Sequence, residues 1–513
     1  MKILMVTAEA APFVRVGGLS QVIYFLSKEL IKQGHDVRVF MPKYGIIDKK
    51  FKTEQVAENI EVPFGKLNKS KVLCNVRVNN YKKNSPSTYF LENREYYELR
   101  ANVFAYKDDH LRFLLLSRGC LEWLMLEQQS KNGWQPDIIH CHDWHTGYLI
   151  DEVRRRPRYS DKFSKTPILY TAHNFRYQGN TGFKYLPPKK QDDGCNLLNT
   201  TDEKKLLRQN PLLRGMLYAD WVNTVSKSHA VEVMTAEYGE GLEKIITKIK
   251  GKFSGILNGL DNKEFNPKTD PFLENNYSVN SVDKRTPNKI ALQKDFDLPE
   301  DENAFLLGFV GRLSKQKGLD ILIPVARRFL EEFSAQFVFL GSGSGEYKKQ
   351  LTKLQKDFPD CVSIHLYPDF KLPRKIFSGA EAILIPSVFE PGGIVALEAM
   401  RYGSIPIIRK TGGLADSVQD FDPQTKTGNG FVFKQLSQWS LFATLVKAMT
   451  LHQQPLIWKK IVRNAMQSDF SWKVTAGEYQ KLYKRIIKQR KRFISTNPHL
   501  AYDPLLKKSA EVC

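Results

Sequence analysis

The stretch ILMVTAEAAPFVRVGGLSQVIYFLSKELIKQGHDVRVF (residues 3–40) decides the fold class. It opens with a short apolar strand, Ile3–Val6, and continues through a glycine loop, Arg15–Leu19. Apolar residues at helical spacing then run over residues 22–33, and a glycine ends the helix. A second apolar strand follows at Asp36–Phe40. Strand, glycine turn, helix and strand in this order are typical of a parallel sheet with crossover helices, so we predict an α/β fold.

The same alternation recurs along the chain and predicts two domains. In the first half, further short apolar runs beside helical stretches lie at residues 137–140, 167–170 and 221–225. After a polar stretch, roughly residues 266–286, the pattern restarts with strands at 305–310, 336–340, 382–385 and 405–408. We therefore predict two doubly wound, Rossmann-like domains facing each other across a cleft, with ligands at the carboxyl ends of the strands. The domains are placed at residues 1–255 and 256–470, and a C-terminal helix and basic tail at 471–513.

The composition is that of a soluble globular protein. Of the 513 residues, 42% are apolar and 26% are charged. No apolar run approaches the ~18 residues that a membrane-spanning helix needs. The six cysteines are scattered and form no CxxC pair, which is typical of free thiols in a reducing cytoplasm and gives no zinc-site spacing. We therefore predict a cytoplasmic protein without a membrane span.

The net charge of +22 is the most unusual bulk property. It is compatible with attraction to phosphorylated ligands, nucleic acid or anionic surfaces, and also with a lysine-rich surface that maintains solubility. We favour the second interpretation, because charge alone bears on association and not on fold. The densest run, Lys484–Arg492, lacks the interleaved aromatic residues on which single-stranded nucleic acids stack. No nucleic-acid partner is expected.

The first motif with chemical content is GRLSKQKG at residues 311–318, directly after an apolar strand. Its cations, Arg312 and Lys317, would emerge at the ligand-bearing edge of the sheet. A diphosphate leaving group gathers negative charge as a glycosidic bond breaks, and fixed cations stabilise that charge. At ~4 Å and an effective dielectric constant near 20, each cation would contribute ~4 kcal/mol, against ~1 kcal/mol in water. The alternative is a basic turn that merely ends a strand.

The second motif is FEPGGI at residues 389–394, which leads into a predicted helix. Its two glycines allow backbone N–H groups to approach an anion, and the helix start adds a positive end. Glu390 would accept hydrogen bonds from sugar hydroxyls. Glu398, two helical turns further on, lies on roughly the same side and would meet ribose hydroxyls. The two motifs together indicate an enzyme that moves a sugar from a nucleotide-sugar donor to an acceptor, with the donor site in the C-terminal half.

On these motifs and others, the chain resembles the bacterial glycogen synthase family, which includes the plant starch synthases, over nearly its whole length. The segments that carry the resemblance are residues 15–19, HCHDWHTG (140–147), TAHNFRYQG (171–179), NTVSKSHAVEV (223–233), YGEGLEKII (238–246), GILNGLDNKEFNP (255–267), residues 311–320, residues 389–416 and DFSWKVTAGEY (469–479). The resemblance implies a GT-B fold of two Rossmann-like domains, with the C-terminal helix packing back on the first domain. It also implies transfer of glucose, with retention of configuration, from ADP-glucose or UDP-glucose to the non-reducing end of an α-1,4-glucan, without a metal or other cofactor.

The resemblance also assigns residues. The catalytic positions would be His173, Arg312, Lys317 and Glu390. The substrate-binding positions would be Arg15, Gly17, Gly18, Asp143, Asn174, Gln178, Tyr367, Gly392, Gly393, Ile394 and Glu398. Arg312 and Lys317 would hold the donor diphosphate, Glu390 the glucose hydroxyls, and Tyr367 the base. His173 would lie beside the donor sugar, Asp143 on the acceptor side, and the Gly17–Gly18 pair against the donor phosphates.

Three positions depart from the family pattern. Arg15 stands where the family usually has lysine, Gln21 where it has an acidic residue, and Gly392 where it has cysteine. Arginine keeps the charge of lysine but is planar and forked. These departures bear on the choice of donor base and the acceptor length more than on the reaction type.

Competing interpretations remain open at this point. His140, Cys141, His142 and His145 suggest a metal site, but alternation along a strand puts His140 and His142 on one face and Cys141 on the other, which disfavours one tetrahedral site. Two further classes of function are another retaining GT-B enzyme, which would make a small glucoside or a surface polysaccharide, and a non-catalytic glucan-binding relative. Retention through same-face attack or through a covalent intermediate is likewise open, and the lack of an obvious nucleophile favours the first.

Overall fold

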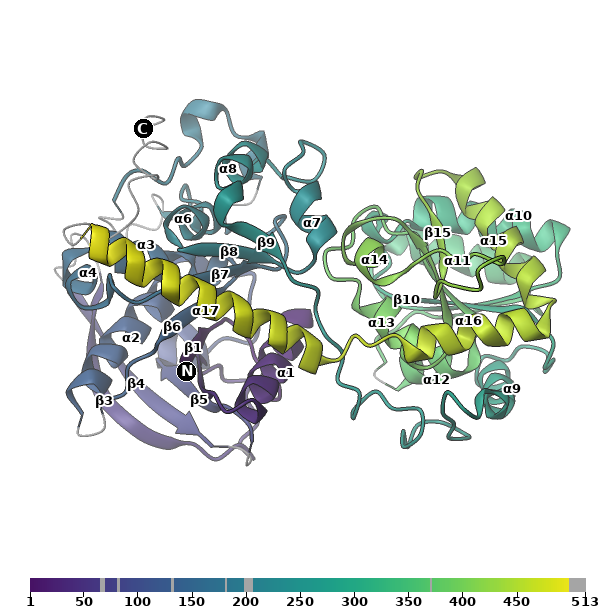
Figure 1. Cartoon of the computed structure of the whole chain (residues 1–513), viewed down its shortest axis with the longest axis horizontal. Helices are drawn as coiled ribbons and strands as arrows, with labels where there is room; N and C mark the ends of the chain where they lie inside the picture. The colour runs from purple at the N-terminus through teal and green to yellow at the C-terminus, as the bar shows by residue number, and fades with distance from the viewer. Residues whose placement is uncertain are drawn as a thin grey trace. The chain divides into compact units, whose positions relative to one another are not determined.

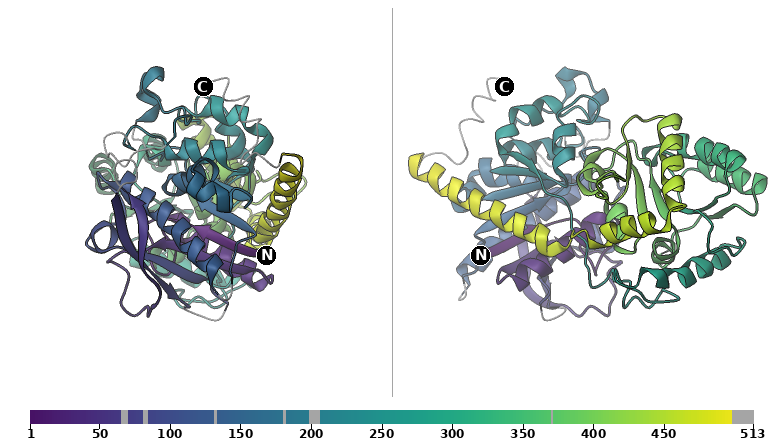
Figure 2. Two further views of the ribbon diagram at one scale, coloured as in Figure 1. Left: turned by 90° about the vertical axis from the view of Figure 1, so that its left-hand side faces the viewer. Right: turned by 45° about the vertical axis from the view of Figure 1, so that its right-hand side comes forward.

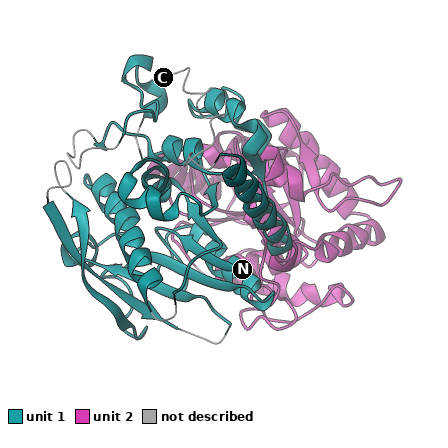
Figure 3. Ribbon diagram, turned by 60° about the vertical axis from the view of Figure 1, so that its left-hand side comes forward, with its two compact units in different colours: residues 1–225, 230–256, 475–513 teal, residues 226–229, 257–474 magenta. Residues whose placement is uncertain are grey.

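The computed structural model describes residues 1–64, 70–80, 84–130, 133–179, 182–197, 206–369 and 371–497. The chain divides into two compact units (Figure 3). Unit 1 comprises Met1–Val225, Ala230–Ile256 and Thr475–Cys513, and unit 2 comprises Ser226–His229 and Leu257–Val474. Each unit is built around its own sheet.

Unit 1 holds a nine-stranded sheet in the order β3-β4-β5-β2-β1-β6-β7-β8-β9. Its strands are β1 (Lys2–Val6), β2 (Asp36–Pro42), β3 (Glu54–Phe64), β4 (Ser70–Asn79), β5 (Ser87–Glu92), β6 (Ile138–His142), β7 (Ile168–Ala172), β8 (Trp221–Thr224) and β9 (Phe253–Gly255). From β5 to β9 all neighbours are parallel, whereas β3–β4 and β4–β5 pair antiparallel. Strands β6 and β7 are buried throughout and β1 at every residue but Lys2, as expected of parallel strands covered on both faces. The predicted parallel sheet is therefore present, with an additional antiparallel extension.

The helices of unit 1 are α1 (Gly18–Lys32), α2 (Asp109–Gln129), α3 (Gly147–Arg155), α4 (Pro157–Phe163), α6 (Pro211–Tyr218), α8 (Glu243–Lys248) and most of α17 (Trp472–Thr496). The short helix α7 (Lys227–Glu232) contains residues of both units. Helix α1 begins at Gly18, inside the predicted loop and earlier than the apolar spacing predicts, with the extended residue Gly17 at its N-cap.

Helix α17 lies along unit 1 (Figures 1 and 2). Its buried residues recur at three- or four-residue steps, which gives the helix one continuous apolar stripe. Tyr483 shares a hydrogen bond of 2.8 Å with His140 of β6, and Tyr479 accepts one of 3.1 Å from Asn223 of β8. The expectation that the C-terminal helix packs back on the first domain is confirmed. Residues 498–513 of the predicted basic tail lie outside the described residues.

Unit 2 holds a six-stranded parallel sheet in the order β12-β11-β10-β13-β14-β15. Its strands are β10 (Leu306–Val310), β11 (Gln336–Leu340), β12 (Val362–His365), β13 (Ala382–Ile385), β14 (Ile405–Arg409) and β15 (Phe431–Phe433). Its helices are α9 (Thr286–Asp295), α10 (Leu319–Glu332), α11 (Gly345–Asp357), α12 (Leu372–Gly379), α13 (Ile394–Arg401), α14 (Gly412–Ser417), α15 (Gln438–His452) and α16 (Pro455–Gln467). The strand order reverses between β10 and β13, the point at which doubly wound sheets bind ligands.

Two further expectations concern membranes and thiols. Within the described ranges, no helix combines the length and the apolar character needed to cross a membrane. Cys74, Cys120, Cys141 and Cys361 are free, as predicted. Cys195 is disulfide-bonded, so the prediction of a free thiol is wrong at that position. Cys513 lies outside the described residues.

Candidate active site

The carboxyl ends of β10 and β13 bring together the two motifs of the C-terminal half. Strand β10 leads into Gly311 and Arg312, and β13 leads into Ser387 and Glu390. Gly318 closes the first loop at a φ of 74°, and a Cβ there would stand 2.0 Å from the Pro386 carbonyl oxygen. The two loops therefore lie in direct contact because position 318 lacks a side chain.

Lys317 and Glu390 form an ion pair in this contact. Lys317 Nζ lies 2.5 Å from Glu390 Oε2, and the Ser387 hydroxyl donates to the same oxygen at 3.0 Å. The Lys317 and Glu390 side chains are only 18% and 15% exposed. A charge-assisted hydrogen bond with so little water around it holds both groups in a fixed geometry. The structure thus places two of the four predicted catalytic residues side by side.

Glycines also fix the backbone of Glu390. The N–H of Gly413 donates to the Glu390 carbonyl at 2.9 Å, and a Cβ on Gly412 would come within 2.2 Å of that oxygen. Gly393 has a φ of 64° and precedes Ile394, where α13 begins. The positive end of α13 therefore follows directly on the Glu390–Gly393 turn, as the sequence predicts for an anion-binding loop.

The remaining donor-side positions differ in exposure. Burial raises the pKa of Glu398 to about 7, although nearby Arg374 opposes this rise. No hydrogen bond joins the Glu398 carboxyl group to another side chain in the part of the chain that the structure describes. Arg312 is exposed, and Tyr367 is 71% exposed. Arg312 and Tyr367 are therefore open to solvent, whereas Glu398 is partly buried, and none of the three is hydrogen-bonded to Lys317 or Glu390 in the described chain.

In unit 1, the glycine loop is held by a residue that the sequence analysis missed. Glu9 follows β1 and is 3% exposed, and its Oε2 accepts hydrogen bonds from the N–H groups of Val16 at 2.7 Å and Gly17 at 3.1 Å. Burial raises the pKa of Glu9 to about 7. The segment from Arg15 to Gly18 stays exposed. The only signal for Glu9 in the sequence was an acidic residue directly after the first strand.

The carboxyl ends of β6 and β7 bring Asp143 and His173 together. Asp143 has a φ of 57°, and its Oδ1 accepts from the backbone N–H of His173 at 2.7 Å. Burial raises the pKa of Asp143 to about 7 and lowers the pKa of His173 to about 3, so the imidazole is neutral near pH 7. Nε2 of His173 lies 3.2 Å from Nδ1 of His142. Asn174 accepts a local hydrogen bond of 3.0 Å from the N–H of Arg176, which shapes the turn after His173.

Gln178 has a different environment from the other predicted site residues. It is 4% exposed, and its Nε2 donates to the carbonyls of Phe175 at 3.0 Å and Glu240 at 2.9 Å. Its Oε1 accepts from Asn210 at 2.7 Å. Both ends of the Gln178 amide are thus engaged within the fold, and the side chain braces the segment after β7.

The histidines and cysteine of β6 are arranged as strand alternation predicts. The rings of His140 and His142 lie with centroids 3.9 Å apart, and His140 contacts Tyr483 of α17. Cys141, between them in the strand, lies near Cys120 of α2. Across the described ranges, no group of three or more His, Cys, Asp or Glu side chains is arranged to hold a metal ion.

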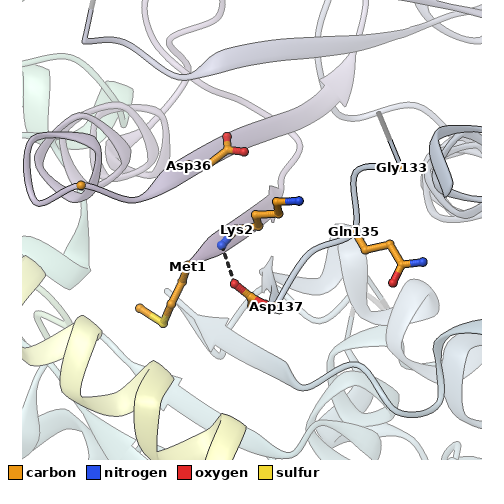
Figure 4. A pocket seen from close by; sticks show the side chains of 7 residues that line it. Met1, Lys2, Asp36, Gly133, Gln135 and Asp137 are labelled. Atoms are coloured by element: carbon orange, nitrogen blue, oxygen red, sulfur yellow. Dashed lines mark hydrogen bonds between the residues drawn. The ribbon is translucent and has the colours of Figure 1, made fainter. Parts of the chain in front are cut away.

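An open pocket of about 460 Å³ lies elsewhere in unit 1 (Figure 4). It is lined by Met1, Lys2, Gly34, Asp36, Gly133, Gln135 and Asp137. These residues stand at the amino ends of β1, β2 and β6, where the backbone N–H of Lys2 donates to Asp137 at 2.7 Å. Ligands of doubly wound sheets bind at the opposite, carboxyl edge. The pocket therefore contains none of the predicted site residues.

Comparison with known proteins adds to this geometry. Residues 2–248 match the starch synthase catalytic domain, and residues 292–465 match glycosyl transferases group 1. The glycogen synthase of Lactobacillus acidophilus is 36% identical over 492 residues, which is 95% of this chain and 100% of that protein. The glycogen synthase of Geobacillus stearothermophilus is 36% identical over 495 residues, which is 95% and 98% of the two chains.

Solved structures agree with the sequence relatives. The catalytic domain of starch synthase IV from Arabidopsis thaliana, bound to ADP and acarbose, is 31% identical with a TM-score of 0.81, covering 95% of this chain and 99% of that one. Sucrose-phosphate synthase from Thermosynechococcus elongatus, 17% identical with a TM-score of 0.57 and covering 95% and 99%, shares the fold. Two Rossmann-like domains of this kind form the GT-B architecture that the sequence predicts. The chain therefore belongs to the glycogen and starch synthase family of glycosyltransferases.

Proposed function

We propose that this enzyme transfers glucose from ADP-glucose or UDP-glucose to the non-reducing end of an α-1,4-glucan, with retention of configuration. The observation that carries the proposal is the Lys317–Glu390 pair at the carboxyl edge of the unit 2 sheet, next to the start of α13. One cation, one sugar-binding carboxylate and one helix N-terminus are what a glucosyl diphosphate needs in one place. The ADP and acarbose bound to the Arabidopsis starch synthase support a nucleotide and a glucan-like acceptor.

Residues 256–470 form the donor domain in this proposal. Lys317 and Arg312 bind the diphosphate and stabilise the charge that collects on it as the glycosidic bond breaks. Glu390 accepts hydrogen bonds from the glucose hydroxyls, and the backbone from Gly392 to Ile394 receives a phosphate at the start of α13. Glu398 accepts from the ribose hydroxyls and Tyr367 stacks on the base. Neither side chain is hydrogen-bonded to its neighbours in the described chain, and Tyr367 is 71% exposed with Lys348 Nζ 5.8 Å from the centroid of its ring.

Residues 1–255 form the acceptor domain, with the helix and tail of residues 471–513 attached. Asp143 binds the incoming glucan, while the Gly17–Gly18 backbone and Arg15 approach the donor phosphates. His173 and Asn174 lie against the donor sugar. The neutral imidazole of His173 donates one hydrogen bond to a sugar hydroxyl, and the backbone carbonyl of His173 faces the positive charge that develops at the anomeric carbon. Gln178 holds the segment after β7 in place through its hydrogen bonds and contributes to substrate binding only through that segment.

The proposed chemistry needs no metal, because Arg312, Lys317 and the α13 N-terminus supply the positive charge. No side chain stands out as an obvious nucleophile, since each carboxylate of the proposed set has another role in it, so we propose same-face attack through an ion pair. A cytoplasmic location completes the proposal, and the free thiols Cys74, Cys120, Cys141 and Cys361 are compatible with it.

A side-by-side assay of the two donors tests this proposal. The purified full chain is incubated with glycogen or maltooligosaccharides and radiolabelled ADP-glucose or UDP-glucose, each with and without EDTA. We expect label in the glucan from at least one donor, unchanged by EDTA, and the ratio of kcat/KM values then identifies the donor. Label on a small acceptor but never on a glucan would instead identify another type of retaining transferase. A chelator-sensitive rate would refute the metal-free chemistry.

A further inference from the structure

His142 is a buried histidine of β6 that touches the proposed catalytic His173. It is 0% exposed, and its Nδ1 lies 3.2 Å from Nε2 of His173. On its other side its ring lies against that of His140. His140 is held at both ring nitrogens, by the hydroxyl of Tyr483 at 2.8 Å and that of Thr171 at 2.7 Å. The ring of His142 is therefore fixed by a neighbour that is itself anchored to α17 and β7.

Hydrogen-bonding capacity decides which nitrogen of His142 carries the proton. Burial lowers the pKa of both His142 and His173, so both rings are neutral near pH 7 and each has a single N–H. Nε2 of His142 is buried and has no hydrogen-bond partner in the described part of the chain. Buried N–H groups without an acceptor are rarer than unused lone pairs, so the proton belongs on Nδ1. Nδ1–H of His142 then donates to Nε2 of His173.

The same reasoning fixes the tautomer of His173. Its Nε2 is occupied as an acceptor, so its proton must lie on Nδ1. No described residue forms a hydrogen bond with Nδ1 of His173, and the side chain of His173 is partly exposed at the carboxyl edge of the sheet. This N–H is therefore available to a ligand. A neutral imidazole in a fixed tautomer can act as a hydrogen-bond donor without any prior rearrangement.

We propose that His142 is a positioning residue for the glucosyl transfer. It donates from Nδ1 to His173 and so presents the Nδ1–H of His173 to a hydroxyl oxygen of the bound sugar. This inference rests on the proposed role of His173. Outer partners that orient metal-bound histidines are worth about 10–100-fold in activity, and we expect a loss of the same order here. The loss should fall on kcat more than on the KM for the nucleotide sugar, because a misdirected N–H of His173 weakens binding of the transition state more than binding of the ground state.

The test compares two variants of His142 in the full chain. His142→Asn keeps an N–H donor near the place of Nδ1, whereas His142→Leu removes it at similar volume. A matched control is His145→Leu, another buried histidine of the same segment, whose ring lies against Trp144 and Phe113 and not against His173. Both His142 variants are also made in a His173→Ala background. Readouts are kcat, donor KM, thermal unfolding, and the tautomer of His173 by NMR of protein labelled with ¹⁵N-histidine.

We expect His142→Leu to lower kcat by about 10–100-fold relative to the wild type. His142→Asn should lose much less, and His145→Leu should keep kcat within a few-fold of the wild type. In the His173→Ala background, His142→Leu should have no further effect, because the two residues act as a unit. The NMR spectrum should place the His173 proton on Nδ1. A proton on Nε2 in the wild type, or an equal loss of kcat in both backgrounds, would overturn the inference. Full activity of His173→Ala would overturn the role of His173 itself, whereas an impaired His173→Ala with a normal His142→Leu would overturn the inference alone. If His142→Leu does not fold, His142→Asn and the tautomer measurement still decide.

Discussion

Replacing Lys317 by methionine removes its ammonium group at nearly constant length. Among the described residues, the Ser387 hydroxyl is then the side-chain partner left to Glu390. Removing one partner of a fully buried ion pair costs about 3–5 kcal/mol, and an exposed pair contributes about 0–1 kcal/mol. This pair is 18% and 15% exposed, so we expect the free energy of unfolding of unit 2 to fall by about 1–3 kcal/mol. For a domain of this size, that corresponds to a drop in Tm of about 2–12 °C.

The effect on catalysis should be larger than the effect on stability. Losing one group that stabilises developing negative charge typically lowers kcat by about 10²–10³, or about 2.7–4 kcal/mol of transition-state stabilisation. The rate of glucose incorporation into glycogen at saturating donor measures kcat, and calorimetry on the same sample measures Tm. Assaying at a temperature well below the Tm of the variant keeps the two effects apart.

The double variant Lys317→Met/Glu390→Gln separates the two roles of the pair. Glutamine at position 390 leaves no unpaired carboxylate in the partly buried site. We therefore expect part of the lost stability to return, while kcat stays at least as low as in Lys317→Met. Recovery of both stability and kcat would show that Lys317 acts only by neutralising Glu390, and would refute its role at the diphosphate. Normal turnover of Lys317→Met alone would refute it as well.

Three further predictions follow from the geometry. The pKa of Glu398 is raised to about 7, and its ionised form is the better acceptor for ribose hydroxyls, so the KM for the nucleotide sugar should rise as the pH falls below about 7. Glu398→Gln should raise this KM and abolish its pH dependence, and an unchanged pH profile in the variant would exclude Glu398 from the donor site. The pKa of Asp143 is about 7 in the folded protein against about 3.9 in the unfolded chain, so between these pH values the native state binds more protons and its stability falls as the pH rises. Asp143→Asn should flatten the pH dependence of Tm in that window. A variant slope equal to that of the wild type would contradict the burial of this carboxyl group. Gly412→Ala would put a Cβ 2.2 Å from the Glu390 carbonyl oxygen at a residue with a φ of 45°, and should lower kcat by about tenfold or more. The control Gly345→Ala places its Cβ where nothing lies within 4 Å and should leave kcat unchanged. Equal kcat values for the two variants would show that this contact does not hold the Glu390 backbone.

The sequence predicted what depends on local pattern. Short apolar runs placed β10, which ends in a glycine turn, and β13 correctly. Parallel neighbours share a carboxyl edge, so the approach of Lys317 to Glu390 across 73 residues was foreseeable. The positive helix start after Gly393 follows from the same local pattern.

Other features depend on contacts that no local pattern reports. Strand β3 is exposed along most of its length and has no apolar run, so its antiparallel pairing with β4, and that of β4 with β5, went unpredicted. Glu9 and Gln178 act through hydrogen bonds to residues brought near only by the fold, Gly17 in one case and Asn210 in the other. The contact between His142 and His173 spans 31 residues and two strands. Such contacts require the strand order, which the sequence alone did not provide.

The proposed reaction elongates an α-1,4-glucan at its non-reducing end with retention of configuration. The most direct measurement is ¹H NMR of the product formed from a defined maltooligosaccharide and each of the two nucleotide sugars, in the presence of EDTA. We expect one added glucose per turnover, joined by an α-1,4 bond at the non-reducing end, from at least one donor. A new β bond, or no transfer to the oligosaccharide from either donor by the folded protein, would contradict it.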